Sequence, residues 1–177
     1  MIKVVEIVRE IVQQASDMYV ETYPNAKPVH FFADNFLAIG NELSIRGQST
    51  KGAKAKYPAI LLFCDDLKER HENMRQWEIE ATLHILIVAD ATEGSGDVQR
   101  DKVFYPILYP IFKCFFDVIY ASPRVFTMGD ALTFDKSDKI LLNAVIGKNR
   151  LFADKLDGID IRNLRLKLIE EKCFLNT

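Results

Sequence analysis

The acidic residues between positions 65 and 72 are the first candidates for chemistry. Asp65 and Asp66 directly follow an apolar segment, and Glu69 and Glu72 come shortly after them. Adjacent carboxylates after a strand can bind a divalent cation or act as an acid–base pair. Basic residues are interleaved with them: Lys68, Arg70 and Arg75. The pattern therefore favours a salt-bridged, solvated loop over a metal or acid–base site.

The histidines and cysteines form no ligand pattern. His30, His71 and His84 are far apart, with no HxxxH or HExxH spacing. His84 shares the polar side of a predicted strand with Thr82 and Glu80, which predicts a surface or subunit-interface histidine. The three cysteines form no CxxC pair and are expected to be small buried residues in a reducing compartment: Cys64, Cys114 and Cys173.

The glycine-bearing segment Gly94–Gln99 follows a predicted strand and precedes a predicted helix. It lacks the third glycine and the acidic residue of a dinucleotide-binding loop, so a turn is expected. The chain also contains no GxxxxGK[ST] or GxSxG motif. The residues therefore predict no catalytic group, no cofactor and no metal ligand.

The segment 46–56 is the one local excess of charge. It carries four basic residues and no acid: Arg46, Lys51, Lys54 and Lys56. Such a loop is either solvated or faces nucleic acid or an acidic neighbouring subunit. It contains no aromatic residue for stacking on bases.

The composition is that of one globular domain, 1–177. The 177 residues are 49% hydrophobic and 27% charged, and the net charge of −2 argues against bulk nucleic-acid binding. Glu6, Arg9 and Glu10 interrupt the apolar N-terminal segment, which predicts neither a signal peptide nor a membrane span. A soluble cytoplasmic protein is expected.

Two strands, Pro58–Cys64 and Trp77–Ala89, are the centre of the predicted fold, joined by the charged loop Asp65–Gln76. The first is apolar on both sides, as in a strand covered on both faces. The second alternates strictly and then becomes apolar on both sides at Leu86–Val88. One end of it is therefore expected to have an open polar face, and the other end a covered one.

Helical spacing predicts two long helices. Residues 2–20 form an amphipathic helix, and residues 97–120 form a core helix that Pro106 and Pro110 should bend or delay. Between them, Val29–Ala33 is a short strand. Asp34 or Asn35 then caps a short helix, or the chain turns there in a β-hairpin.

The C-terminal third is less regular. Val125–Met128 and Ile140–Gly147 are possible strands, and Leu151–Gly158 is a helical turn or a loop. The weak periodicity of Arg124–Arg150 suggests an arm that orders on a partner. A final strand follows, and its apolar residues share one face only if a bulge adds a residue near Arg162–Asn163: Ile159, Ile161, Leu164, Leu166 and Leu168. The predicted class is α+β, a mostly antiparallel sheet with two long helices packed on one face.

Three segments resemble a group of small proteins encoded by phages and prophages of Bacteroidetes-type bacteria. They are KYPAILLFCD at 56–65, EATLHILIVADA at 80–91 and RDKVFYPILYPIFKCFFDVI at 100–119. The segment DGIDIRNLRLKL resembles the closing strand of that group. The order of elements is similar to that of phage tail-terminator and head–tail joining proteins.

This resemblance implies a virion structural protein of the neck or tail end. Such proteins form rings around the DNA channel, assemble in the host cytoplasm, and contact themselves and other neck or tail-tube proteins. No cofactor and no membrane are implied. The charged hairpin is then the expected subunit interface: Asp65, Asp66, Lys68, Arg70, Arg75, Trp77, Glu78 and Glu80. A small α+β enzyme using dispersed groups such as His30, His84 and Tyr57, or a non-viral binding module, is the alternative.

Overall fold

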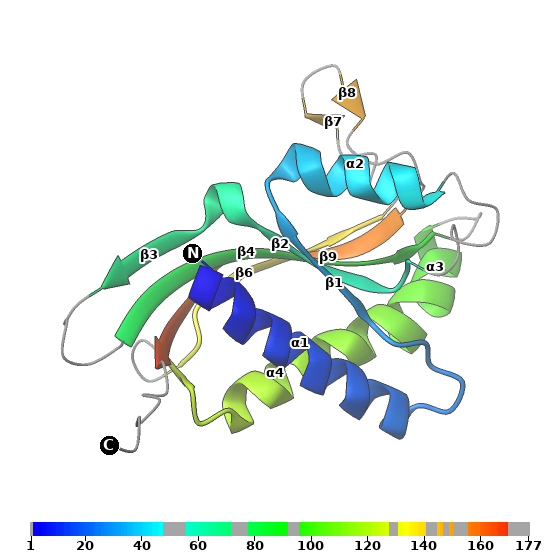
Figure 1. Ribbon diagram of the computed structural model, residues 1–177. Coiled ribbons are helices and arrows are strands. Elements are labelled where there is room, and N and C mark those ends of the chain that lie inside the picture. Colours follow the sequence, from blue (N-terminus) through cyan, green and yellow to red (C-terminus); the bar gives the residue numbers. More distant parts are fainter. Residues whose placement is uncertain are drawn as a thin grey trace.

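The computed structural model describes residues 2–47, 56–71, 78–91, 96–127, 131–140, 145–146, 149–150 and 156–169. These residues form a seven-stranded mixed sheet with helices on both faces. Figure 1 shows α2 on one side of the sheet, and α1 and α4 on the other. The predicted α+β class is therefore confirmed.

The sheet has the strand order β1-β2-β4-β9-β5, with β3 also pairing with β4 and β6 with β9. Its members are β1 (His30–Asp34), β2 (Ala59–Phe63), β3 (Lys68–His71), β4 (Glu78–Asp90), β5 (Val125–Thr127), β6 (Asp135–Lys139) and β9 (Leu156–Ile169). β1 and β2 are parallel, whereas the other pairs of this sheet are antiparallel. A separate pair joins β7 (Val145–Ile146) to β8 (Asn149–Arg150).

The helix α2 (Phe36–Gly47) is the crossover that makes β1 and β2 parallel. Asn35 begins it, because its side-chain Oδ1 accepts a hydrogen bond from the N–H of Ala38 at 2.9 Å. The predicted short helix is confirmed, and the alternative hairpin is wrong. The predicted arrangement places helices on one face of the sheet only. In the structure α2 covers the face away from α1, so both faces carry helices.

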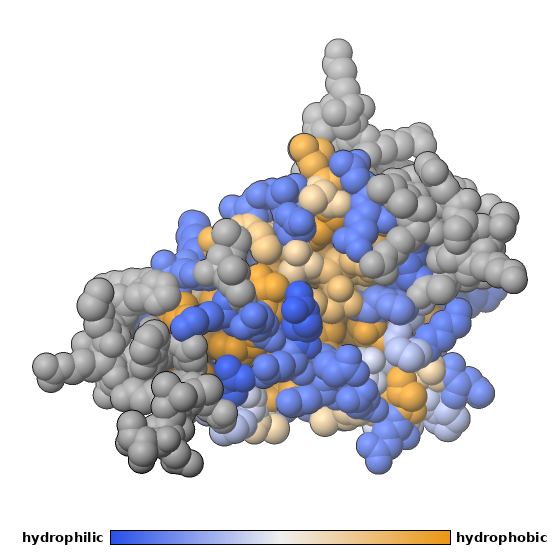
Figure 2. All heavy atoms as spheres, viewed as in Figure 1, coloured by the Kyte–Doolittle hydropathy of each residue, from blue (hydrophilic) through white to orange (hydrophobic). Residues whose placement is uncertain are grey.

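The larger core lies between the sheet and two helices, α1 (Ile2–Thr22) and α4 (Tyr109–Ala121). Alternate residues of β4 enter it: Ile79, Ala81, Leu83, Ile85 and Ile87. The other side of α1 is polar, as its helical period predicts, and Figure 2 shows hydrophilic residues over its outward surface. Arg124 ties α1 to the end of α4 through an ion pair with Glu10 at 2.5 Å.

The helix before β5 starts at Gly96 and continues to Ala121. It passes from α3 (Gly96–Gln99) through a π-helical segment, η2 (Arg100–Leu108), into α4. Pro106 lies within η2, so a π-helical segment accommodates the proline, and the start of the helix is not delayed. The helix is long and apolar enough to cross a membrane by length and composition. Its buried side is part of the core, which accounts for that composition.

The second face of the sheet is divided into two halves, as the parities of β4 predict. Under α2, a smaller core joins Leu86 and Val88 to Leu61, Phe63 and Ile39. Glu80 and Thr82, further back along β4 on the same face, are only half-buried. This second half, beyond His84, is called the open half-face below.

Two polar strands were not expected from the sequence. Part of the predicted loop at 65–76 is a 3-10 turn, η1 (Cys64–Asp66), followed by β3. The other is β6, which has the sequence DKSDK and comes before the possible strand Ile140–Gly147. Within that range, Val145–Ile146 is a strand, and 141–144 lie outside the described residues. Both β3 and β6 are set by pairing with β4 or β9 rather than by apolar residues. Because β5 and β6 are paired with β9, 124–150 is not an unstructured arm throughout.

The predicted bulge in the last strand is confirmed. Leu83 pairs with Leu164 and Ile85 pairs with Ile161, so β9 has one more residue than β4 between these two pairs. Asn163 takes a positive φ of 54° there. The extra residue keeps the leucines after it on the core face.

Candidate functional site

The most connected polar group in the described structure lies where the covered half of the second face meets the open half-face. Nδ1 of His84 lies 2.6 Å from Oδ2 of Asp66, and Nε2 lies 2.8 Å from Oδ1 of Asp160. Nε of Arg162 donates to the other oxygen of Asp160 at 3.0 Å. The side chains of His84 and Asp160 are 9% and 6% exposed. The prediction of a surface histidine is wrong.

The contacts of His84 determine its charge. Ionised carboxylates only accept hydrogen bonds, so both ring nitrogens must carry a proton to bond both acids. Burial alone would lower the pKa of His84, but the hydrogen bonds with Asp160 and Asp66 outweigh it and raise the pKa above 6.5. Burial alone would raise the pKa of Asp160, but the His84 hydrogen bond and the charges of His84 and Arg162 lower it. The group is an ion network held between two strands.

This arrangement does not suit His84 to proton transfer. A general base needs a ring nitrogen within reach of a substrate, and both nitrogens of His84 are occupied by carboxylates. The ring also packs on Phe63, with the centroids 4.7 Å apart, and Phe63 stacks on Phe36 of α2. The network therefore fixes η1 and α2 to the sheet.

Asp65 attaches α2 to η1 through a separate hydrogen bond. Its Oδ2 accepts a hydrogen bond from the N–H of Phe36 at 3.0 Å, in the first turn of α2. An anion at this end is also favoured by the helix dipole. The two adjacent acids that follow β2 thus join different elements: Asp65 binds α2, and Asp66 binds β4.

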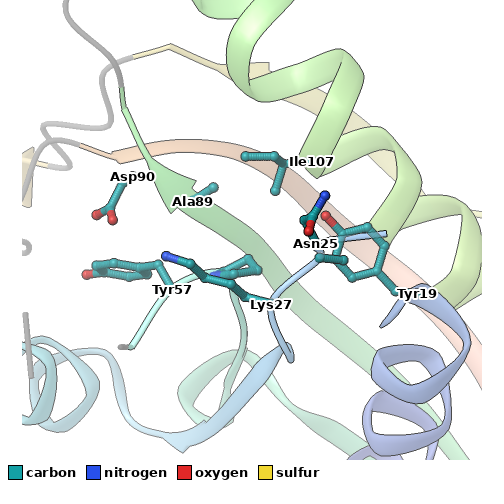
Figure 3. Close-up of a pocket in the computed structure, with 9 residues that line it drawn as sticks. Tyr19, Asn25, Lys27, Tyr57, Ala89, Asp90 and Ile107 are labelled. Atoms are coloured by element: carbon teal, nitrogen blue, oxygen red, sulfur yellow. The ribbon is translucent and has the colours of Figure 1, made fainter. Parts of the chain in front are cut away.

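A cavity of about 250 Å³ opens at the other end of the sheet. It lies between the end of α1, the 25–27 loop, the start of β2, the end of β4 and η2. In Figure 3, the amine of Lys27 extends between Tyr57 and Asp90, while Asn25 lies next to Tyr19. The Tyr57–Pro58 peptide bond at its wall is cis.

The cavity offers a cation, a carboxylate, an amide and two phenols to a bound molecule. Burial raises the pKa of Tyr19, so its hydroxyl stays protonated and can donate. The volume lies just below the range of about 300–1,000 Å³ that is usual for ligand pockets. Of the three groups considered for catalysis, only Tyr57 lines it, and His84 is committed elsewhere.

The predicted subunit-interface residues have different positions. Asp65 and Asp66 bond within the chain, although the Asp66 side chain is 62% exposed. Lys68 is exposed on β3, and Glu80 is half-buried on β4. Arg70 and Glu78 lie on these strands by register. Two of the predicted positions lie outside the described residues: Arg75 and Trp77.

The four predicted basic contacts are also separated. Lys56 is 2% exposed, and its Nζ donates to the carbonyl of Leu43 at 2.6 Å, so it faces the interior rather than a phosphate. Arg46 belongs to the last turn of α2. Lys51 and Lys54 lie outside the described residues, and contact of this loop with DNA stays a prediction.

Sequence reasoning missed Asp160 and Arg162. One signal was present in the alternation of β9. Asp160 lies on the side of the strand opposite to Ile159 and Ile161, and at this level α2 covers the side that carries Asp160. A buried acid needs a cationic partner. His84 is the cation on the neighbouring strand. Among the described residues, no three histidine, cysteine or acidic side chains are placed to hold a metal ion.

The comparisons with known proteins add no family. The chain matches no protein-family model, and no curated protein sequence matches it significantly.

Proposed function

We propose that this chain is a virion structural protein of a phage neck or tail end, a tail terminator or head–tail connector that assembles as a ring around the DNA channel. The observation that carries the proposal is the open sheet. Among the described residues, β1 pairs only with β2 on one side, and β5 and β6 pair only with β9 on the other. A closed head-to-tail ring needs two unlike surfaces on each subunit, and these two edges are unlike.

The segments that resemble phage proteins give further support. They form β2, β4 and the helix from η2 into α4, which together make up much of the buried core. The resemblance therefore concerns a scaffold rather than a catalytic site. That fits a protein whose function lies in its assembled shape.

The β5 edge offers a specific contact. Phe126 is 46% exposed and lies opposite Lys167 by register. An exposed aromatic residue at a strand edge is suited to contact a neighbouring strand or loop. The turn η1 between β2 and β3, with the exposed Asp65 and Asp66, is a second contact in the proposal, and other neck or tail-tube proteins are its further partners.

Light scattering and negative-stain electron microscopy of the full chain test this proposal. We expect closed rings, either at high concentration or after adding virion extract. Phe126→Asp should prevent ring formation, whereas Tyr120→Asp, which changes a 65% exposed residue of α4, should leave the rings intact. Mass spectrometry of purified particles should detect the chain. A strictly monomeric protein under all these conditions, absent from particles, would contradict the proposal.

A further inference from the structure

The open half-face carries basic side chains that the strand register brings together. Lys68 of β3 and Arg165 of β9 both lie opposite Thr82 of β4, one on each side. The two cationic residues are therefore two strand spacings apart, about 10 Å at the backbone. Lys167 follows on the same face, opposite Glu80.

Two of these cations are available to a partner. Lys68 and Arg165 are exposed, and within the part of the chain that the structure describes neither side chain makes a hydrogen bond or an ion pair. Lys167 is half-buried beside Glu80, the one carboxylate of this half-face among the described side chains. The surface thus presents more positive than negative charge.

Arg162 lies between this surface and α2. Its side chain is 62% exposed, and Asp160 holds its Nε at 3.0 Å. Asp160 also binds His84, and the exposed Asp135 of β6 lies opposite Arg162 by register. Arg162 therefore has acidic neighbours on β9 and β6 and adds little to the positive charge of the open half-face.

The outer side of α1 has the opposite balance. Its exposed acids outnumber its exposed bases, with Glu6, Glu10, Asp17 and Glu21 against Lys3 and Arg9. Although the net charge is only −2, the outer side of α1 is negative and the open half-face is positive. A polyanion approaching this protein would be oriented toward the sheet.

We propose that the open half-face, defined by Lys68, Thr82, Arg165 and Lys167, binds the phosphate backbone of nucleic acid. An arginine can bind a phosphate through two N–H groups, a lysine contributes a point charge, and the threonine hydroxyl between them can donate a hydrogen bond. These contacts read no base, so the binding is independent of sequence. The choice of DNA as the polyanion rests on the proposed function, whereas the cationic surface does not.

Fluorescence anisotropy with labelled short duplex DNA, measured over a series of salt concentrations, tests this surface. The double variant Lys68→Gln/Arg165→Gln removes two phosphate contacts. The slope of log K against log salt concentration should therefore become shallower by about 2. The matched control is Lys102→Gln/Lys113→Gln, which removes two exposed cations from the helix layer and should keep the wild-type slope.

A second readout needs no variant. Acetylation of Lys68 in the wild-type chain should be slowed by bound DNA, while acetylation of Lys113 should not, as measured by mass spectrometry. Equal protection of both lysines, an equal loss of slope in both double variants, or no binding at low salt would overturn the inference. Polyglutamate that protects Lys68 as well as DNA does would instead assign the surface to an acidic protein. DNA binding without rings refutes the proposed function alone, and rings without DNA binding refute this inference alone.

Discussion

Nδ1 of His84 lies 2.6 Å from Oδ2 of Asp66, and the same ring reaches Asp160 through Nε2 at 2.8 Å. One side chain thereby joins η1, β4 and β9. The first pair links residues 18 positions apart, and the second links residues 76 positions apart. Because the three segments meet only in the folded chain, the protonation of His84 is coupled to folding.

Stability should depend on pH through this network. The pKa of His84 is raised in the folded state, so its contribution is fully present below the unfolded value of 6.5 and is lost as pH rises through the folded pKa. The pKa of Asp160 is lowered, so its contribution is present above 3.8 and is lost as pH falls through the folded pKa. Urea denaturation should therefore give a maximum free energy of unfolding between these two values.

Replacement of His84 tests the same coupling. His84→Phe keeps a ring on Phe63 but leaves the buried Asp160 with Arg162 alone, and it should lower the free energy of unfolding by about 3 kcal/mol near pH 6. It should also remove the loss of stability above pH 6.5. His30→Phe on β1 is the control and should leave the loss of stability above pH 6.5 unchanged. If the loss of stability above pH 6.5 persists in His84→Phe, a group other than His84 causes it.

Asp65 should stabilise α2 locally. Asp65→Ala removes the acceptor for the N–H of Phe36 and the charge at the helix N-terminus, for an expected loss of about 1 kcal/mol. Asp65→Asn keeps an acceptor and should lose less. Thermal unfolding followed by circular dichroism provides the measurement. The pH dependence attributed to His84 should be the same in both variants, since Asp66 rather than Asp65 contacts the ring.

Tyr109 should titrate apart from the other tyrosines. Its hydroxyl donates to Oδ2 of Asp138 at 2.5 Å, and this hydrogen bond, with burial and the charge of Asp138, raises its pKa to about 12. Ultraviolet absorbance of phenolate should show Tyr109 as the last phase, after Tyr19, whose pKa is also raised by burial. Asp138→Asn removes the charged acceptor and should shift that phase to lower pH, whereas Tyr109→Phe should abolish it. A last phase that persists unchanged in Tyr109→Phe would assign it to another tyrosine.

The extent to which the sequence predicts this fold differs between elements for physical reasons. Elements with a strong apolar period, such as 2–20 and the apolar end of β4, are recognised because that period reflects burial. The strands β3 and β6 have no such period, since pairing with a neighbour decides their conformation. The His84 network was missed for a related reason, because His84 and its two acidic partners come from three segments, β4, η1 and β9. No spacing within one segment reveals them.

The bulge at Asn163 allows the sharpest test of how β9 is placed. Deleting Asn163 restores strict alternation, so Leu164 and the leucines after it stay on the core face and the chain should still fold. The change puts Arg162 directly opposite His84, and the facing positive charges should lower the pKa of His84, measured by NMR titration. Deleting Arg165 is the matched control. It leaves the bulge but turns Lys167 into the core, and it should unfold the protein. Equal tolerance of both deletions would mean that the register of β9 is not fixed by its leucines.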